Sequence, residues 1–221
     1  MNNSYKNVRI IFEDNHLLVV EKPVNVLSQA DSTNEEDMLS ILKEYVKEKY
    51  QKPGNVYIGL VHRLDRPVGG VMAFARTSKA ASRLSEEIRT RNFKKVYTAL
   101  VHGRIKEKSG TLRHFLYKDE KTNISRVVPP SDKNGKEAIL DYEVLEYRGD
   151  KTLVKVNLHT GRPHQIRVQF SSIGHPLVGD QRYGAELTRP GEQIHLWSSE
   201  ITFTHPTTKE QMTFNSTPQW I

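Results

Sequence analysis

The sequence predicts one mixed α+β domain over residues 1–221, with strands that pair mostly antiparallel. Short β-branched and aromatic runs, closed by Gly, Pro or Asn turns, follow one another along most of the chain. Three segments instead carry the three- and four-residue apolar spacing of an amphipathic helix. Consecutive strands on short turns pair antiparallel, and 221 residues suffice for one sizeable core.

The first ninety or so residues are expected to form a hairpin, two helices and two strands around a polar loop. The turn Glu13-Asp14-Asn15 closes the hairpin. Thr33 or Asn34 is the expected cap of the first helix, because such side chains accept hydrogen bonds from the first helical N–H groups. Thr77 or Ser78 is the expected cap of the second helix. The elements predicted here are the strands Arg9–Phe12 and His16–Glu21, the helix Glu36–Tyr50, the strands Val56–Val61 and Val71–Ala75, and the helix Lys79–Asn92.

The remaining residues are expected to form further strands and a third helix. This helix of about three turns begins at Pro163, whose fixed φ suits a first helical position, and ends before Gly174. Ile166 and Phe170 would share its buried face, and Arg167 would emerge at the rim of the core. The predicted strands are Phe93–Gly103, Leu112–Leu116, Ser125–Val128, Lys136–Tyr147, Leu153–Leu158, Ile194–Trp197, Ile201–Thr204 and Gln211–Phe214.

Composition limits both the class of protein and its compartment. The chain has no Cys, which excludes disulfides, thiolate zinc sites and a Cys nucleophile and fits the reducing cytoplasm. No apolar run is long enough to span a bilayer, and residues 1–7 show no hydrophobic signal region. Lys and Arg exceed Asp and Glu by 33 to 26, and they are spread along the chain. We therefore expect a folded surface with a positive groove for a polyanion such as nucleic acid.

A polar loop, residues 62–67, stands between two apolar runs that read as strands. It holds one carboxylate, Asp65, with a cation on either side, Arg63 and Arg66. By itself this pattern is typical of a surface turn with a salt-bridged Asp. It also fits a catalytic loop, because a loop held by rigid strands can fix a reacting group.

Four blocks of sequence together resemble the pseudouridine synthases of the RluA type, in the order in which that family carries them. The resemblance extends from about Ile10 to Phe214. The chain departs from the family pattern at Val68-Gly69-Gly70, at Gln169 and at Leu196-Trp197-Ser198, which bears on RNA contacts and subfamily. The matching blocks are the catalytic loop His62–Arg66 with the strand Gly70–Thr77, the tyrosine strand Lys94–Gly103, the arginine helix Thr160–Val168, and the following turn Gly174–Gly184.

The resemblance implies a pseudouridine synthase-like α+β fold, a long, bent, mainly antiparallel sheet flanked by helices with an RNA cleft across its middle. It implies an isomerase that converts uridine in ribosomal or transfer RNA to pseudouridine without a cofactor. The nine His residues show no metal-ligand spacing, so no metal is expected either. The chain is expected to act as a monomer and, since it starts close to the first family strand, without the small N-terminal RNA-binding module of some members.

The same resemblance assigns roles to particular residues. Asp65 would be the catalytic carboxylate, either attacking the anomeric carbon or removing the proton from carbon 2 of the sugar. Arg167 would pair with it and keep it ionised. Tyr97 would stack on the uracil, Ile166 would form an apolar wall against it, and Arg63 would lie against the RNA. Expected phosphate contacts are Lys94, Lys95, Arg162 and Arg182.

Two other functions are compatible with the sequence. One is an RNA-binding or RNA-chaperone module that has the scaffold but performs no chemistry, against which the combination of Asp65, Tyr97 and Arg167 argues. The other is a hydrolase that cleaves a glycosidic bond and releases the base. Such enzymes commonly use two carboxylates, whereas Asp65 alone stands in a catalytic context here.

Overall fold

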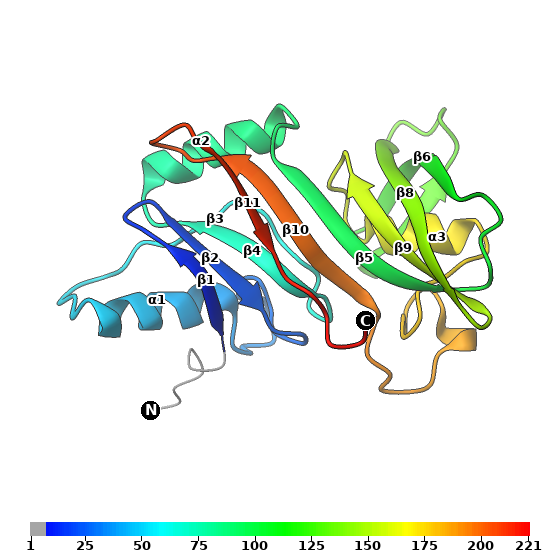
Figure 1. Cartoon of the computed structure of the whole chain (residues 1–221), viewed down its shortest axis with the longest axis horizontal. Helices are drawn as coiled ribbons and strands as arrows, with labels where there is room; N and C mark the ends of the chain where they lie inside the picture. Colours follow the sequence, from blue (N-terminus) through cyan, green and yellow to red (C-terminus); the bar gives the residue numbers. More distant parts are fainter. Residues whose placement is uncertain (1–7) are drawn as a thin grey trace. The chain divides into compact units, whose positions relative to one another are not determined.

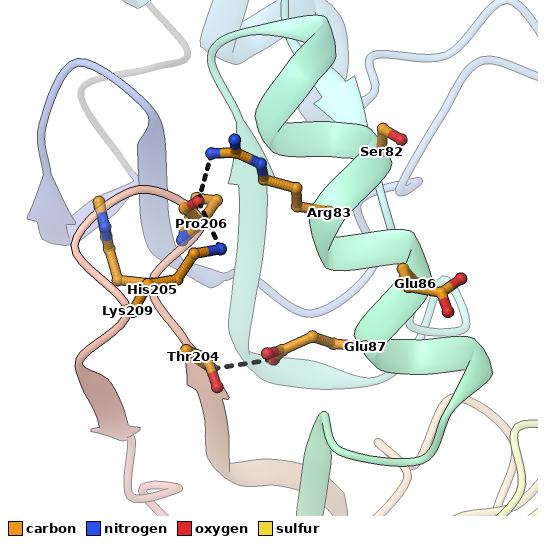
Figure 2. Close-up of a pocket in the computed structure, with 8 residues that line it drawn as sticks. All are labelled: Ser82, Arg83, Glu86, Glu87, Thr204, His205, Pro206 and Lys209. Atoms are coloured by element: carbon orange, nitrogen blue, oxygen red, sulfur yellow. Dashed lines mark hydrogen bonds between the residues drawn. The ribbon is translucent and has the colours of Figure 1, made fainter.

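A computed structural model describes residues 8–221, and these divide into two compact units. Unit 1 contains residues 8–94, 198–219 and Ile221, and unit 2 contains residues 95–197 and Trp220. Figure 1 follows the chain from the first hairpin (blue) through unit 2 (green to orange) to the last strand (red). The expectation of a single domain over residues 1–221 stays a prediction, and the expectation about a signal region falls outside the described residues.

Unit 1 is built on a sheet with the strand order β1-β2-β4-β10, to which β3 adds on β4 and β11 on β10. The pairs β1–β2, β2–β4, β3–β4 and β10–β11 are antiparallel, as predicted. The strands of this unit are β1 (Arg9–Glu13), β2 (Leu17–Lys22), β3 (Gly59–Leu60), β4 (Gly69–Ala75), β10 (Leu196–Thr204, of which Leu196 and Trp197 belong to unit 2) and β11 (Gln211–Asn215).

Both faces of β4 are buried, because all its residues from Gly69 to Ala75 are buried. One face packs against α2 (Ser78–Arg89), whose Ala80 and Leu84 join a core cluster with Leu17 and Val71. The helix α1 (Met38–Lys49) buries a stripe of its own, Met38, Ile41, Leu42 and Val46. A strand buried on both faces reads as a continuous apolar run rather than an alternating one. The rigid core of unit 1 therefore lies directly beside the polar loop that precedes β4.

The strands of unit 2 follow one another in the order β5-β9-β8-β6-β7, and each neighbouring pair is antiparallel. The helix α3 (Gln165–Ser172) contacts β6 and β7, and its Phe170 meets Tyr142 edge-on at 5.8 Å between ring centroids. A short 3-10 turn, η2, covers Ala185–Leu187. The strands are β5 (Lys94–His102, of which Lys94 belongs to unit 1), β6 (Ser109–Asp119), β7 (Ile124–Val128), β8 (Lys136–Arg148) and β9 (Lys151–Leu158).

The expected cap of the first helix is wrong. α1 is capped by Asp37, whose carboxylate accepts from the N–H groups of Leu39 (2.9 Å) and Ser40 (3.3 Å). The hydroxyl of Thr33 instead donates to Asp31, which closes a turn before the helix. Local side-chain bonds of this kind compete with capping. The cap of α2 is Thr77, one of the two residues predicted.

The third helix is shorter than predicted, because His164 adopts a left-handed backbone conformation with φ of 54°. α3 therefore begins at Gln165 and not at Pro163, and it has 8 residues. The side chain of Gln165 accepts from the N–H of Arg162 (3.0 Å) and from the hydroxyl of Thr160 (2.8 Å), which fixes the turn before the helix. Two strand predictions also fail: β10 is one continuous strand, and only Gly59 and Leu60 of the run 56–61 are in a strand.

A buried carboxylate ties the first hairpin of unit 1 to α1 and to the end of β4. Glu13 has 8% of its side chain exposed. Burial would raise its pKa, but hydrogen bonds from Lys49, Tyr45 and Tyr50 outweigh that effect, so the pKa of Glu13 lies below its usual value. Its partners are Lys49 Nζ (2.6 Å), the hydroxyls of Tyr45 and Tyr50 (both 2.8 Å) and a guanidinium nitrogen of Arg76 (3.1 Å).

None of the helices in residues 8–221 is both long and apolar enough to cross a bilayer. The same stretch of chain contains no group of three or more His, Asp or Glu side chains arranged to hold a metal ion.

Candidate active site

Asp65 lies in unit 1, in the loop between β3 and β4. Its carbonyl accepts a hydrogen bond from the N–H of Val68 at 3.0 Å, which closes a tight turn. Leu64 and Val68 on either side are buried, Asp65 is partly exposed, and Arg63 and Arg66 are exposed. The loop is therefore anchored by apolar side chains while its charged groups remain accessible.

Polar contacts fix the same loop from three directions. The hydroxyl of Ser28 donates to the carbonyl of Leu64 (2.8 Å) and accepts from its N–H (3.1 Å). Nε2 of His62 accepts from the N–H of Ala73 in β4 at 3.0 Å. Gly70, with φ of +119°, lies so close to Ser198 of β10 that a Cβ there would be 2.3 Å from the Ser198 carbonyl oxygen. Any other residue would push β10 away from β4 at the end of the loop.

A further anchor of the loop is Lys22, which sequence reasoning missed. It is the last residue of β2, its side chain is 0% exposed, and its Nζ donates to carbonyl oxygens of the loop. Burial lowers the pKa of Lys22 to about 7, while the negative charge of Asp65 acts in the opposite direction. The only signal in the sequence was a lysine directly before a proline at the end of an apolar strand.

Unit 2 holds Arg167 in a buried ion pair with Asp180. Nε of Arg167 donates to Oδ2 and its NH2 group donates to Oδ1, both at 2.8 Å, and the two side chains are 7% and 0% exposed. Burial would raise the pKa of Asp180. The hydrogen bonds and charge of Arg167 together outweigh that effect, so the pKa of Asp180 lies below its usual value. Arg167 is thus buried, whereas the sequence placed its guanidinium at the rim of the core, and Asp180 is a partner that the sequence analysis did not assign.

Tyr183 completes the surroundings of Arg167. The guanidinium carbon lies 5.1 Å from the centroid of the Tyr183 ring, within the range of a cation–π contact. The Tyr183 hydroxyl accepts from the N–H of Ser125 (2.9 Å) and lies 2.7 Å from Nδ1 of His164. A guanidinium held by a bidentate carboxylate and an aromatic face has little rotational freedom.

The other predicted base contacts also lie in unit 2. Tyr97 is in β5, opposite Val156 of β9, and is 6% exposed. Ile166 is in the first turn of α3 and is 4% exposed. Both side chains are thus set in regular elements, which position them more tightly than a loop would.

The predicted phosphate contacts have different surroundings. Lys94 is exposed, whereas Lys95 is partly buried and its pKa is lowered by desolvation. Nε of Arg162 donates to the carbonyl of Glu137 (2.8 Å), and the exposed Arg182 donates to the carbonyl of Asn123 (2.7 Å). Their roles toward RNA stay predictions.

The structure thus brings Arg63 and Asp65 together in unit 1, and Tyr97, Ile166 and Arg167 are all in unit 2. The expected pairing of Asp65 with Arg167 joins residues of different units and stays a prediction. Chemically, unit 1 supplies an accessible carboxylate on a fixed loop beside a buried ammonium, which suits nucleophilic or proton-transfer catalysis.

Comparison with known proteins identifies the family. Residues 16–172 match the model of the RNA pseudouridylate synthase family. An RNA pseudouridine synthase of Aquifex aeolicus is 37% identical over 94% of this chain and 68% of its own length. One of Bacillus subtilis is 32% identical over 93% and 67%, and the ribosomal large subunit pseudouridine synthase D of Nitrosomonas europaea is 35% identical over 90% and 59%. The chain therefore belongs to the RNA pseudouridylate synthase family, a class of isomerases that act on RNA.

Solved structures agree with this assignment. The human RNA pseudouridylate synthase domain containing 4 superposes with a TM-score of 0.82 and 21% identity, covering 99% of this chain and 93% of its own. The human RNA pseudouridylate synthase domain containing 1 gives a TM-score of 0.75 and 26% identity over 98% and 86%. The α+β fold is that of the pseudouridine synthases, as predicted. The chain spans from about three-fifths to two-thirds of the length of the three relatives named above.

Proposed function

We propose that this chain isomerises specific uridines of ribosomal or transfer RNA to pseudouridine, with Asp65 as the catalytic carboxylate. The observation that carries the proposal is the fixed loop of unit 1, which holds an accessible carboxylate in a member of this family. Ribosomal RNA is favoured by two relatives whose names specify the ribosomal large subunit, those of Nitrosomonas europaea and Vibrio vulnificus. The cytoplasm is the compartment that such a substrate requires.

The reaction needs no redox step, because substrate and product have the same composition. The bond from the anomeric carbon to nitrogen 1 breaks, the uracil turns in the site, and carbon 5 bonds to the sugar. The hydrogen on carbon 5 then leaves as a proton, and nitrogen 1 gains one. Asp65 acts either by attack on the anomeric carbon or by removing the proton on carbon 2 of the sugar.

Residues of unit 2 contact the base and supply a positive charge. Tyr97 stacks on the uracil, Ile166 provides an apolar wall, and Arg167 supplies a positive charge toward the reacting groups. The support for Arg167 is its burial and its fixed orientation against Asp180. A guanidinium that cannot rotate costs little further ordering when the substrate binds.

RNA binding has to offset the cost of extracting the base. Turning a nucleotide out of a folded RNA costs about a few kcal/mol. Arg63 would lie against the RNA, and contacts of Lys94, Lys95, Arg162 and Arg182 with phosphate would supply part of that energy. The net charge of +7 supports such contacts. Binding should weaken steeply as the salt concentration rises. We propose that a monomer suffices.

The test uses RNA labelled with tritium at carbon 5 of uridine, taken from cells that lack the gene, because such RNA is unmodified at the target. Tritium release by the wild-type protein and none by Asp65→Ala is the expected result. Separate incubations with ribosomal and transfer RNA then identify the substrate. If RNA binds but neither protein releases tritium, the chain is a binding module, and free uracil among the products would indicate a hydrolase.

The hydroxyl of Tyr97 is expected to matter for turnover and not for binding. Tyr97→Phe keeps the aromatic ring, so stacking and the Michaelis constant should change less than about twofold. If the hydroxyl takes part in removing the carbon 5 proton, turnover should fall by about 100-fold, the lower range for general acid–base groups. Rates of tritium release at saturating RNA measure this. Full activity of Tyr97→Phe would restrict Tyr97 to packing against the base.

A further inference from the structure

The side chain of Lys22 is completely buried although it carries a charge. Its Nζ donates three hydrogen bonds, to the carbonyl oxygens of Pro23 (2.9 Å), Arg66 (3.1 Å) and Val68 (2.8 Å). The last two belong to the loop of Asp65 and lie on its C-terminal side. All three donors of the ammonium are therefore used, and two of them hold the backbone that follows the proposed catalytic residue.

Burying the ammonium group of Lys22 is energetically unfavourable. Removing a charged group from water is strongly unfavourable, and an apolar side chain of similar length would avoid that cost. Neutral carbonyls compensate only in part, which is why the pKa of Lys22 falls to about 7. The placement of a charged residue here thus calls for a role beyond packing β2 against β4.

The contacts of Lys22 complement those of Ser28. Ser28 binds the backbone of Leu64 just before Asp65, and Lys22 binds the backbone of Arg66 and Val68 just after it. The backbone on both sides of Asp65 is therefore fixed by buried side chains. In addition, the positive charge of Lys22 acts on Asp65 directly.

We propose that Lys22 is a positioning residue, which fixes the backbone after Asp65 and acts on its carboxylate through a positive charge, so that the carboxylate keeps its reactive orientation. This inference rests on the proposed function of Asp65. It concerns how that carboxylate is held, and Lys22 itself does not touch the substrate.

The charges around Lys22 can be enumerated element by element. In the loop, Asp65 is the residue whose negative charge acts on Lys22. The guanidinium of Arg66 is instead paired with Glu35 at 2.6 Å. The preceding Glu21 of β2 bonds to the hydroxyl of Ser216 at 2.7 Å. Residues 23–28 and β4 carry no titratable side chain. A pH effect transmitted by Lys22 should therefore reach the reaction through Asp65.

The first test compares Lys22→Met with Glu13→Gln, a matched control that weakens a buried polar network elsewhere in unit 1. Both variants should melt at lower temperature than the wild type. Below both melting temperatures, Lys22→Met should lower the turnover number at least tenfold with the Michaelis constant changed less than about twofold. Glu13→Gln should keep wild-type turnover. Equal turnover in the two variants, or wild-type turnover in a folded Lys22→Met, would overturn the proposal.

The second test remains informative if Lys22→Met does not fold. Turnover of the wild type should fall as pH rises through the pKa of Lys22, about 7, because the neutral amine loses the charge and one donor. Lys22→Arg keeps its charge at every pH in this range, so the fall should be absent. A basic limb that is the same in both proteins, or absent from the wild type, contradicts the proposal. Failure of the proposed function would appear differently, as a wild-type protein inactive on every RNA.

Discussion

Asp65→Asn is expected to lower turnover by roughly 1,000-fold or more while the affinity for RNA changes less than about twofold. The amide has the shape of the carboxylate but can neither attack a carbon centre nor accept a proton at neutral pH. The loop itself should persist, because Ser28 and Lys22 bind its backbone and not the side chain of Asp65. Single-turnover tritium release and a filter-binding titration on the same RNA measure the two quantities.

Glu35→Gln provides the matched control for this substitution. Glu35 pairs with Arg66, the residue next to Asp65, at 2.6 Å, and both side chains are close to half exposed. The chemical change is the same, and an exposed ion pair contributes little to stability. Activity should therefore stay at the wild-type level. If Asp65→Asn retained turnover within about tenfold of the wild type, another group would have to be the catalyst.

Asp180→Asn is expected to lower the free energy of unfolding by roughly 3–5 kcal/mol, the usual cost of removing one partner of a buried ion pair. The amide oxygen can still accept from the N–H groups of Arg182 and Tyr183, which bind Oδ1 of Asp180 in the wild type. Its NH₂ group, however, then takes the place of Oδ2 and faces the Nε–H donor of Arg167. Urea denaturation followed by circular dichroism measures the loss. Turnover should fall as well, since Arg167 would lose its fixed orientation.

Two comparisons separate this effect from a general loss of packing. Arg167→Met should cost a similar amount, and combining it with Asp180→Leu should recover much of the loss, because a buried pair can often be replaced by apolar side chains. Glu86→Gln breaks the exposed pair with Arg89 in α2 and should cause no measurable change. A loss for Asp180→Asn as small as that for Glu86→Gln would show that the buried pair is not needed for stability.

The pH dependence of the same pair follows from the depressed pKa of Asp180. An unfolded chain protonates this carboxyl near its ordinary value, before the native protein does. The stabilisation is therefore fully present above that value and disappears as pH falls through the lower pKa of the native state. The difference in stability between wild type and Asp180→Asn should accordingly shrink below about pH 4.

Local patterns sufficed for most of the fold. The hairpin turn at residues 13–15, the apolar spacing of α1 and α2 and the antiparallel pairings follow from short-range rules, and the structure confirms them. The errors occur where one residue adopts an unusual state. His164 delays α3 through its left-handed conformation, and Thr33 uses its hydroxyl in a turn instead of a cap. Neither the backbone conformation of His164 nor the turn at Thr33 produces a periodic sequence pattern from which it could be predicted.

Resemblance to a family located Asp65, but it did not reveal what holds the site in place. Lys22 and Asp180 are charged residues that composition and hydrophobic pattern place on the surface, and both are at most 1% exposed. Their burial becomes evident only when their partners, the loop carbonyls and Arg167, are brought beside them by segments 13 to 46 residues away in sequence. Such long-range contacts are set by the whole fold and not by local spacing.

The order in which the two units appear along the chain has a consequence for synthesis on the ribosome. Unit 1 consists of the first 94 residues together with residues 198–219, so its sheet lacks β10 and β11 until the last part of the chain has emerged. Until then β4, apolar along its whole length, has an open edge that invites non-native pairing. All strands of unit 2 emerge earlier and without interruption, apart from the start of β10. The second unit is therefore expected to fold first, and the unit that carries Asp65 to close last.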